Sequence, residues 1–286
     1  MPELPEVETT KTSLLPLLEQ TVQDIQVRQS SLRWPIPEDI SRLKGQRLLQ
    51  LSRRSKYIIA EFEQDHMLWH LGMSGSFRLC QPDEALRKHD HLIITFDDVQ
   101  LRYHDPRRFG CILWLDQEAD LKLLQPLGPE PLSEAFNADY LYEKLRNKNV
   151  AIKVAIMDNH VVVGVGNIYA TESLFLQGIH PAQPASSLSY EQITKLVLEI
   201  KQILQRAIQL GGSTLRDYSN AMGENGYFQQ TLLAYGRAGE MCINCETGLE
   251  NIKLGQRASV FCPECQPLKK VKLPAKRVTA VRAKKS

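Results

Sequence analysis

Apolar side chains recur with helical spacing over one long segment, from about residue 189 to residue 210. Ser189 with Gln192 matches the sequence signature of a capping box, and the pair Gly211–Gly212 stops the repeat. The pattern predicts an amphipathic helix with one apolar face, formed by Ile193, Leu196, Val197, Ile200, Ile203, Leu204, Ala207 and Ile208.

A different pattern, of short apolar stretches separated by turn residues, fills residues 21–115. Lys56–Phe62, His91–Phe96 and Cys111–Leu115 are three such stretches. They predict an antiparallel β-sandwich. A helix that opens the chain is predicted to precede it, running to about Leu18 with a bend at Pro16.

A break rich in proline and glycine, at 125–131, separates the β-rich region from one with helical periodicity. Shorter helices are predicted in that second region, near 138–146, 151–158 and 168–177. We therefore predict an α+β multidomain chain. Its parts are an N-terminal β-sandwich over 1–130, a helical domain over 131–228, a cysteine-containing hairpin over 229–266 and a basic tail over 267–286, which we expect to be disordered.

Charge is distributed unevenly along the 286 residues. The net charge is +2, yet residues 266–286 carry eight Lys or Arg and no acid, so the rest of the chain is net acidic. The hypothesis that the protein binds nucleic acid therefore depends on local basic clusters and not on the overall charge. No run approaches the roughly 18 apolar residues that a membrane span needs, and no export signal is evident. We expect a cytoplasmic protein.

The first residues carry an unusual combination of groups. Removal of Met1 would leave Pro2 as a free secondary amine, and an α-amino group has a pKa of roughly 8, so part of it is nucleophilic near neutral pH. Glu3 could then exchange protons at the same reacting centre, and Glu6 could orient the pair. The alternative is an ordinary helix start, with an early proline and acidic residues that suit the helix dipole.

Four of the six cysteines form two Cys-x-x-Cys pairs, Cys242 with Cys245 and Cys262 with Cys265. Four thiolates at this spacing suit one tetrahedral zinc ion with no open position, which is a structural site. Two redox pairs or an iron–sulfur centre are the alternatives. Between the pairs, residues 256–261 predict one strand of a hairpin, and Arg257 is expected either at its functional tip or as a solvated surface charge.

Basic and aromatic residues interleave at Arg53–Tyr57 and Asp105–Gly110, as suits phosphate contacts and insertion into a base stack. The loop Leu71–Gly75 places Met73 between glycines. Each of these could instead be a solvated face or, for Met73, a buried side chain. His89–His91 lacks an obvious third metal ligand, so a phosphate contact is preferred for His89.

The glycine-rich stretch Val163–Tyr169 brings backbone close to a partner. Asn167 is predicted to cap the next helix, whose free amides would suit a phosphate. A tight interhelical turn is the alternative.

These motifs together resemble the bacterial formamidopyrimidine-DNA glycosylases, the base-excision enzymes for oxidised purines. The resemblance runs from Pro2 to about Gln266, and the basic tail departs from the family pattern, which usually stops just after the last cysteine. It rests, beside the four cysteines, on Pro2–Thr9, Arg53–Tyr57, His70–Gly75, Lys88–His91, Asp105–Gly110 and Gly164–Tyr169.

The resemblance implies a β-sandwich carrying the catalytic helix, a helix–two-turns–helix domain and a zinc hairpin, with damaged double-stranded DNA between them. It implies that Pro2 attacks the sugar C1′, that Glu3 is its acid–base partner, and that Lys56 contacts phosphate and serves the lyase steps. Arg257 would hold a phosphate and assist the second elimination. One structural zinc ion and a monomer are expected.

Further DNA contacts are implied by the same resemblance. Met73, Arg107 and Phe109 would fill the space of the extruded nucleotide, with Arg107 facing the orphaned cytosine. Asn167 would hold a phosphate that flanks the lesion, and Lys148 would make a further DNA contact. The phosphate contact of His89, preferred above from the residues themselves, adds to these. A loop around 216–227 is expected to cover the lesion.

Two other functions remain open at this point. A related glycosylase for oxidised pyrimidines shares the proline nucleophile and the finger, although Leu4, Met73, Arg107 and Phe109 resemble the purine enzymes. A zinc-containing DNA-binding protein without catalysis would leave Pro2 and Glu3 without a purpose.

Overall fold

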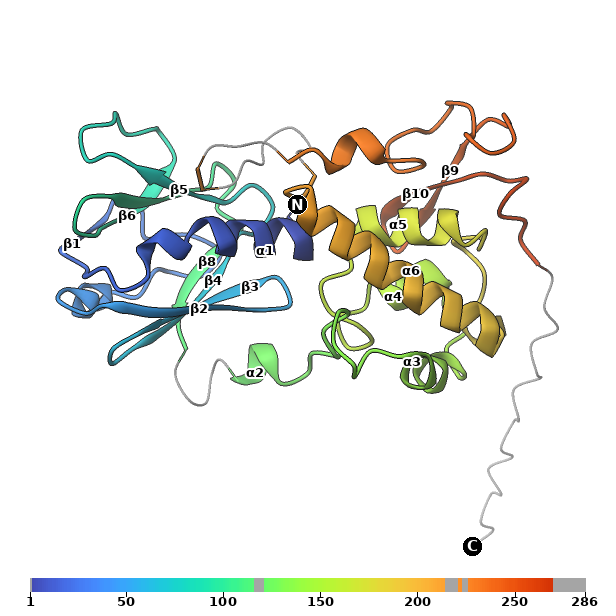
Figure 1. Ribbon diagram of the computed structural model, residues 1–286, viewed down its shortest axis with the longest axis horizontal. Coiled ribbons are helices and arrows are strands. Elements are labelled where there is room, and N and C mark those ends of the chain that lie inside the picture. The colour runs from blue at the N-terminus through green and yellow to red at the C-terminus, as the bar shows by residue number, and fades with distance from the viewer. Residues whose placement is uncertain (1, 116–120, 214–220, 223–225, 270–286) are drawn as a thin grey trace, which may run out of the picture.

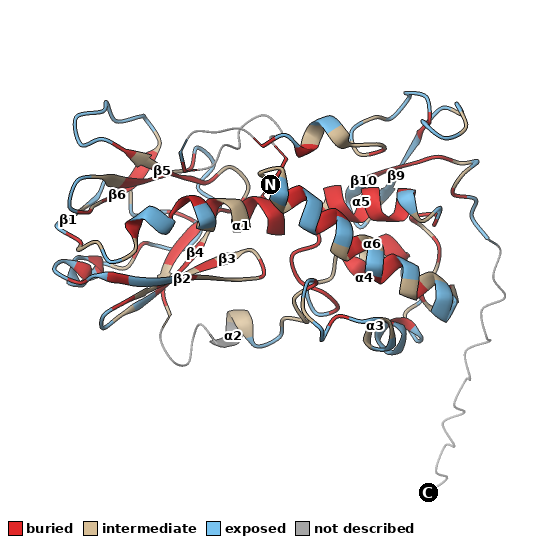
Figure 2. Ribbon diagram, in the orientation of Figure 1, coloured by how far each residue is buried: buried red, intermediate tan, exposed pale blue. Residues whose placement is uncertain are grey.

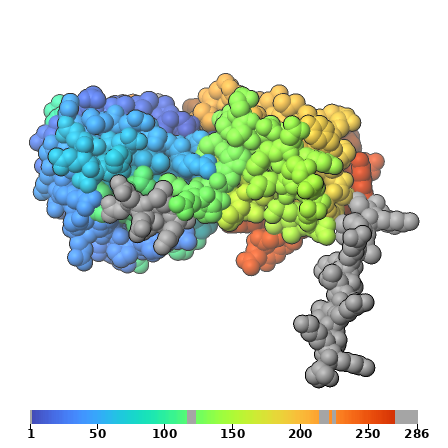
Figure 3. All heavy atoms as spheres, turned by 90° about the horizontal axis from the view of Figure 1, so that it is seen from below, coloured from blue at the N-terminus to red at the C-terminus, as the bar shows by residue number. Residues whose placement is uncertain are grey.

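The computed structural model describes residues 2–115, 121–213, 221–222 and 226–269. A β-rich half and a helical half lie side by side, and the chain begins where they meet (Figure 1). The space-filling view from below shows the two halves in direct contact (Figure 3). Most of the expected lesion-covering loop, and the basic tail beyond Lys269, lie outside the described residues.

The β-rich half contains two four-stranded antiparallel sheets. One has the order β1–β6–β7–β5 and the other β2–β3–β4–β8. Their facing side chains form one core, in which the rings of Trp69 on β4 and Phe77 on β5 lie 4.9 Å apart. The strands are β1 (Asp24–Val27), β2 (Leu48–Arg54), β3 (Tyr57–Phe62), β4 (His66–His70), β5 (Ser76–Cys80), β6 (Asp90–Thr95), β7 (Gln100–His104) and β8 (Cys111–Trp114). The predicted sandwich is confirmed.

The opening helix α1 (Leu4–Ser13) is shorter than predicted. It ends before Leu14, and Pro16 lies in a separate turn of 3-10 helix at Leu15–Leu17. The predicted continuation to Leu18 was wrong because proline has no backbone N–H to donate and disfavours helical geometry in the residue before it. α1 packs against β2 and β3 on one side and α6 on the other, so it joins the two halves.

The helical half has its own core. The long helix α6 (Tyr190–Gln209) begins with the predicted capping box of Ser189 and Gln192, and its apolar face is buried as predicted. α5 is buried on nearly all sides (Figure 2). The other helices are α2 (Leu121–Leu124), α3 (Ala138–Leu145), α4 (Ile152–Ile156) and α5 (Asn167–Leu176).

A two-stranded hairpin, β9 (Glu250–Leu254) with β10 (Arg257–Phe261), follows the helices. It packs on α5 through a small third core that includes Phe175, Ala234 and Val260. Within the described residues, no helix has the length and apolar character to cross a membrane.

Candidate active site

The side chain of Glu3 is the centre of the candidate site. It is buried, and its carboxylate accepts hydrogen bonds from the backbone N–H groups of Gly166 at 2.9 Å and Ile168 at 3.0 Å. These amides belong to the N-terminus of α5. The prediction that they are free to bind a phosphate was wrong, because Glu3 occupies them. Asn167 is not the cap of α5 either, since Gly166 holds that position.

Glycines make this approach possible. A Cβ on Gly166 would overlap the carboxylate of Glu3, lying 2.6 Å from Oε2 and still nearer to Cδ, far inside van der Waals contact. Gly164 has a φ of +78°, and its carbonyl accepts a hydrogen bond from the N–H of Leu4 at 3.2 Å. The first turn of the chain, and not a ligand phosphate, therefore packs against the backbone of the glycine-rich stretch.

Glu6 fixes Glu3 from the other side. One of its carboxylate oxygens accepts the backbone N–H of Glu3 at 2.8 Å. The other accepts the Tyr169 hydroxyl at 2.6 Å and the N–H of Ser213 at 2.8 Å. Glu6 thus ties the start of α1 to α5 and to Ser213, which follows α6.

The electrostatics of Glu3 and Lys56 oppose full ionisation. Burial raises the pKa of Glu3, the positive charge of Lys56 lowers it, and the negative charge of Glu6 raises it, with a net upward shift. Burial lowers the pKa of Lys56, Glu3 and Glu6 oppose this, and Arg257 adds to it. Shifts of this kind, upward for a carboxyl and downward for an amine, favour proton exchange by both groups and are typical of catalytic sites.

A pocket of about 340 Å³ opens between the two halves of the molecule. The structure brings together there five residues that the sequence singled out, together with Tyr235 and others. These five are Glu3, Lys56, Met73, Asn167 and Arg257. Pro2, the residue before Glu3, is buried, and Met1 lies outside the described residues.

The loop that carries Arg107 and Phe109 is exposed. The Arg107 guanidinium carbon lies 4.8 Å from the centre of the Phe109 ring. Asp105 organises this loop by accepting the N–H groups of Arg107 at 3.2 Å and Gly110 at 2.9 Å. It also accepts the Ser74 hydroxyl at 2.7 Å, which joins the loop to the one that carries Met73.

Two predicted DNA contacts lie in other depressions of the surface. His89 lines one of about 390 Å³ that also includes Arg28, Lys88 and Arg108. Its neighbour Asp90 is buried and bound by Arg78 and His104.

Lys148 and Arg257 line a third depression, of about 430 Å³, below the tip of the hairpin. Lys148 is 3.9 Å from Asp158 in a partly exposed ion pair.

Arg53 and Arg54 do not face solvent as free phosphate ligands. Arg53 donates to Glu8 at 2.7 Å and to Glu130 at 2.7 Å, and Arg54 donates to Glu130 at 2.9 Å. Neither a phosphate contact nor a solvated face, the two possibilities for this cluster, describes the pair, because acidic partners distant in sequence already bind both guanidinium groups. Lys56 alone of the three cations lines the active-site pocket.

Sequence reasoning missed two residues of this region. Lys153 is buried, and its ammonium donates to the Ala258 carbonyl at 2.9 Å and the Ser259 hydroxyl at 2.9 Å, beside Arg257. Burial lowers the pKa of Lys153 to about 8. Tyr235 lines the pocket together with Asn167. A single lysine on a short helix and a single tyrosine in a loop give no sequence signal.

The four predicted metal-ligating cysteines do converge. Their sulfur atoms all lie within 4.8 Å of one another, and the pair Cys245–Cys262 is 3.4 Å apart. Tetrahedral zinc with Zn–S bonds of about 2.3 Å requires sulfur atoms about 3.8 Å apart. The donor set therefore fits a metal ion of this kind, and within the described residues no other cluster of histidine, cysteine or acidic side chains of this type is found.

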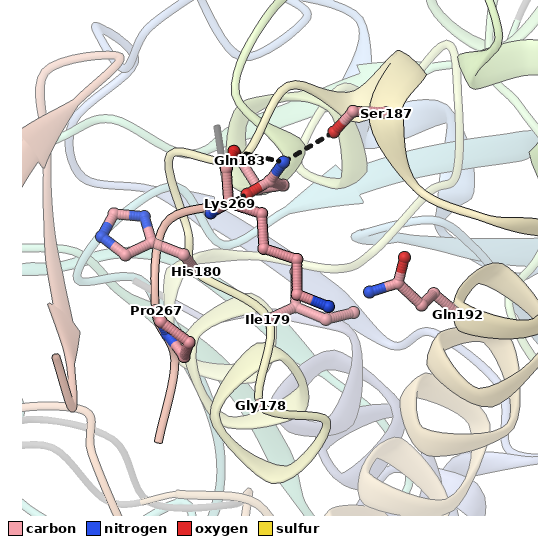
Figure 4. A pocket seen from close by; sticks show the side chains of 8 residues that line it. All are labelled: Gly178, Ile179, His180, Gln183, Ser187, Gln192, Pro267 and Lys269. Atoms are coloured by element: carbon pink, nitrogen blue, oxygen red, sulfur yellow. Dashed lines mark hydrogen bonds between the residues drawn. The ribbon is translucent and has the colours of Figure 1, made fainter. Parts of the chain in front are cut away.

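A smaller pocket of about 230 Å³ lies beyond the other end of α5 (Figure 4). Gln183 forms part of its wall. The side chain of Gln183 accepts the N–H of Lys269 at 3.0 Å and donates to the Ser187 hydroxyl at 2.8 Å. It thereby fixes the chain at Lys269, near the start of the tail, and the pocket contains none of the predicted site residues.

Comparison with known proteins gives consistent results. The family model described as the formamidopyrimidine-DNA glycosylase N-terminal domain matches residues 1–112, and the model of the H2TH domain of the same glycosylases matches residues 127–219. Formamidopyrimidine-DNA glycosylase from Acinetobacter baylyi is 79% identical over 271 residues, which are 94% of this chain and 100% of the relative. The Acinetobacter baumannii protein of that name is 76% identical over 274 residues, covering 96% and 100%.

Solved structures agree with these relatives. A Lactococcus lactis FPG mutant in complex with DNA that contains Fapy-dG has a TM-score of 0.86 and 38% identity, covering 93% of this chain and 100% of that one. The Lactococcus lactis Fpg bound to DNA with an abasic site has a TM-score of 0.85, also at 38% identity, covering 93% and 99%. On this evidence, together with the site around Glu3 and the four-cysteine hairpin, the chain belongs to the formamidopyrimidine-DNA glycosylase family.

Proposed function

We propose that this base-excision repair glycosylase removes oxidised purines, such as 8-oxoguanine and formamidopyrimidines, from duplex DNA and then cleaves the strand as an abasic-site lyase. The observation that carries the proposal is the position of Glu3. Its carboxyl is buried, has a raised pKa and lies in a pocket with Lys56. In the sequence, Glu3 directly follows Pro2, which becomes the N-terminus once Met1 is removed.

In the proposed reaction, the nitrogen of Pro2 forms a bond to C1′ of the extruded nucleotide while the bond from C1′ to the base breaks. The base leaves with a proton. Glu3, whose pKa is raised by burial, donates a proton as the sugar ring opens, and an iminium ion results. Loss of a C2′ proton then expels the 3′ phosphate, a second elimination expels the 5′ phosphate, and water hydrolyses the iminium to release Pro2.

DNA binding in this proposal uses the cations around the pocket. Lys56, Arg257, Lys148 and the amide of Asn167 contact phosphates on either side of the lesion, and His89 contacts a phosphate in its own depression. Met73, Arg107 and Phe109 enter the space of the extruded nucleotide. The domains proposed are the sandwich over 1–130, the helix–two-turns–helix domain over 131–228 and the finger over 229–266, followed by the tail.

The four cysteines would hold one zinc ion, which fixes the finger that presents Arg257 and takes no part in the chemistry. The enzyme is proposed to act as a monomer on damaged double-stranded DNA in the cytoplasm.

Borohydride trapping tests the proposal. Mature protein is incubated with duplexes containing 8-oxoguanine or an oxidised pyrimidine, and the covalent complex is quantified. Trapping on 8-oxoguanine is expected to dominate, and a variant with one extra residue before Pro2 should fold and bind yet not trap. Preferential trapping on the pyrimidine would favour the related pyrimidine glycosylase, and full trapping by the extended protein would remove Pro2 as the nucleophile.

A further inference from the structure

The turn that presents Lys56 has an unusual backbone. β2 and β3 are joined by the two residues Ser55 and Lys56, and Ser55 has a φ of +57°. Residues other than glycine seldom adopt this left-handed conformation, and they do so at a cost in energy unless the surroundings hold them there. Ser55 is also buried, so its backbone polar groups must find partners within the protein.

Both polar backbone groups of Ser55 are bound by the same ion pair. Its N–H donates to Oε1 of Glu130 at 2.7 Å, and its carbonyl accepts Nη1 of Arg53 at 2.8 Å. That same Nη1 donates to Oε2 of Glu130 at 2.7 Å. Three short bonds, two of them to a carboxylate, thus close a ring around the residue before Lys56.

The ion pair is itself tied to two other parts of the molecule. Arg53 donates through Nε to Glu8 on α1, the helix that begins after Glu3, at 2.7 Å. Arg54 donates to Glu130 at 2.9 Å and to the carbonyls of Leu127 and Gly128 at 3.0 and 2.6 Å. The turn is therefore fixed relative to both the catalytic helix and the segment between the domains.

We propose that Glu130, together with Arg53, is a positioning residue for Lys56 and acts through the backbone of Ser55. The inference rests on the role proposed above for Lys56 in phosphate contact and strand cleavage. Glu130 does not line the pocket, so it touches no substrate. Its effect is to hold the ammonium of Lys56 in the pocket that also contains Glu3.

A purely structural tie between the domains would behave differently from a positioning residue. Loss of such a tie would lower stability and slow every step, whether or not Lys56 is present. Loss of a positioning residue slows only the steps that use Lys56, and it has no further effect once the ammonium is gone. A double-mutant cycle separates the two cases.

The test uses Glu130→Gln, Lys56→Ala and the double variant, with Glu134→Gln as a matched control. Glu134 is an exposed carboxylate in the same segment. The measurement is the single-turnover rate of strand cleavage at a preformed abasic site under saturating enzyme. Glu130→Gln should slow cleavage about tenfold, the scale expected for a modest displacement of a reacting group. Glu134→Gln should match wild type, and the double variant should be no slower than Lys56→Ala. Additive losses would overturn the proposal.

A second readout follows Lys56 itself. Its ammonium has a lowered pKa in the burial that the turn imposes. Acetic anhydride labelling at low conversion, read by mass spectrometry across pH, reports that pKa in full-length protein. Glu130→Gln should move the labelling profile of Lys56 to higher pH and leave other lysines unchanged. An unmoved profile would contradict the positioning of Lys56 by Glu130. If Glu130→Gln does not fold, the shorter Glu130→Asp, which cannot reach all three donors, takes its place.

The two readouts distinguish failure of the inference about Glu130 from failure of the function proposed for Lys56. If the labelling profile moves but Lys56→Ala cleaves abasic DNA at the wild-type rate, Glu130 positions Lys56 while the lyase role of Lys56 is withdrawn. If Lys56→Ala is slow and Glu130→Gln changes neither cleavage nor labelling, the lyase role of Lys56 stands and the positioning role of Glu130 is withdrawn.

Discussion

Substitution of Gly166 by alanine should separate catalysis from DNA binding. Its φ of −111° suits any residue, so alanine is not opposed by the backbone. The added Cβ, however, would lie 2.6 Å from Oε2 of Glu3 and nearer still to Cδ and Oε1 of the same carboxylate. Glu3 or the start of α5 must therefore move.

The magnitude follows from the hydrogen bonds that this movement would break. Glu3 accepts two short backbone hydrogen bonds, and bonds to a charged group contribute about 1.5–3 kcal/mol each. Replacing glycine by alanine also lowers the conformational entropy of the unfolded chain, which offsets roughly 0.4–1 kcal/mol of this loss. The free energy of unfolding should thus fall by about 2–5 kcal/mol, and a displacement of about 1 Å at a catalytic group can slow the chemical step about a hundredfold.

The assay combines thermal unfolding with single-turnover excision of 8-oxoguanine at saturating enzyme and with binding to duplex DNA. Gly248→Ala is the control, because its Cβ would meet nothing within 4 Å and its backbone is not left-handed. Gly166→Ala should unfold at a lower temperature and excise slowly while binding undamaged DNA like wild type. Excision and unfolding temperature both equal to those of the control would refute the idea that α5 fixes Glu3.

Three further outcomes are expected. Cys262→Ser should lose bound zinc by elemental analysis and bind lesion DNA far more weakly while the sandwich stays folded, because the finger has a small separate core; intact binding without metal would contradict this. Arg107→Ala should flatten the preference for cytosine opposite the lesion in excision assays, whereas equal slowing against all four bases would assign Arg107 to backbone contacts alone. Truncation after Lys269 keeps the hydrogen bond between Lys269 and Gln183 and removes seven of the eight tail cations. The slope of log affinity against log salt should then become shallower by about 0.9 for every DNA phosphate that the tail neutralises in the full-length protein, with excision at saturating enzyme unchanged. An unchanged slope would leave the tail without a role in DNA binding.

Much of the site could be predicted from local pattern and resemblance. The four cysteines were found because ligands at fixed short spacing are set by the chain itself, and their sulfur atoms do converge. The expectation of free amides at the start of α5 failed for the opposite reason. The carboxylate that binds them lies 163 residues earlier in the sequence, and no local rule reports such a partner. Nor does a local rule report that Glu8 and Glu130 bind Arg53 and Arg54.

The sequence by itself determined the elements whose cause is local. The apolar repeat and capping box of α6, the strands of the sandwich and the opening motif depend on residues a few positions apart, so periodicity and motif reveal them. Only the tertiary structure decided which charges neutralise one another. Glu3 hydrogen-bonds α5, Glu130 hydrogen-bonds the turn before Lys56, and Lys153 hydrogen-bonds the finger. A buried polar group needs a hydrogen-bond partner, and only the packing of distant segments brings these partners within reach.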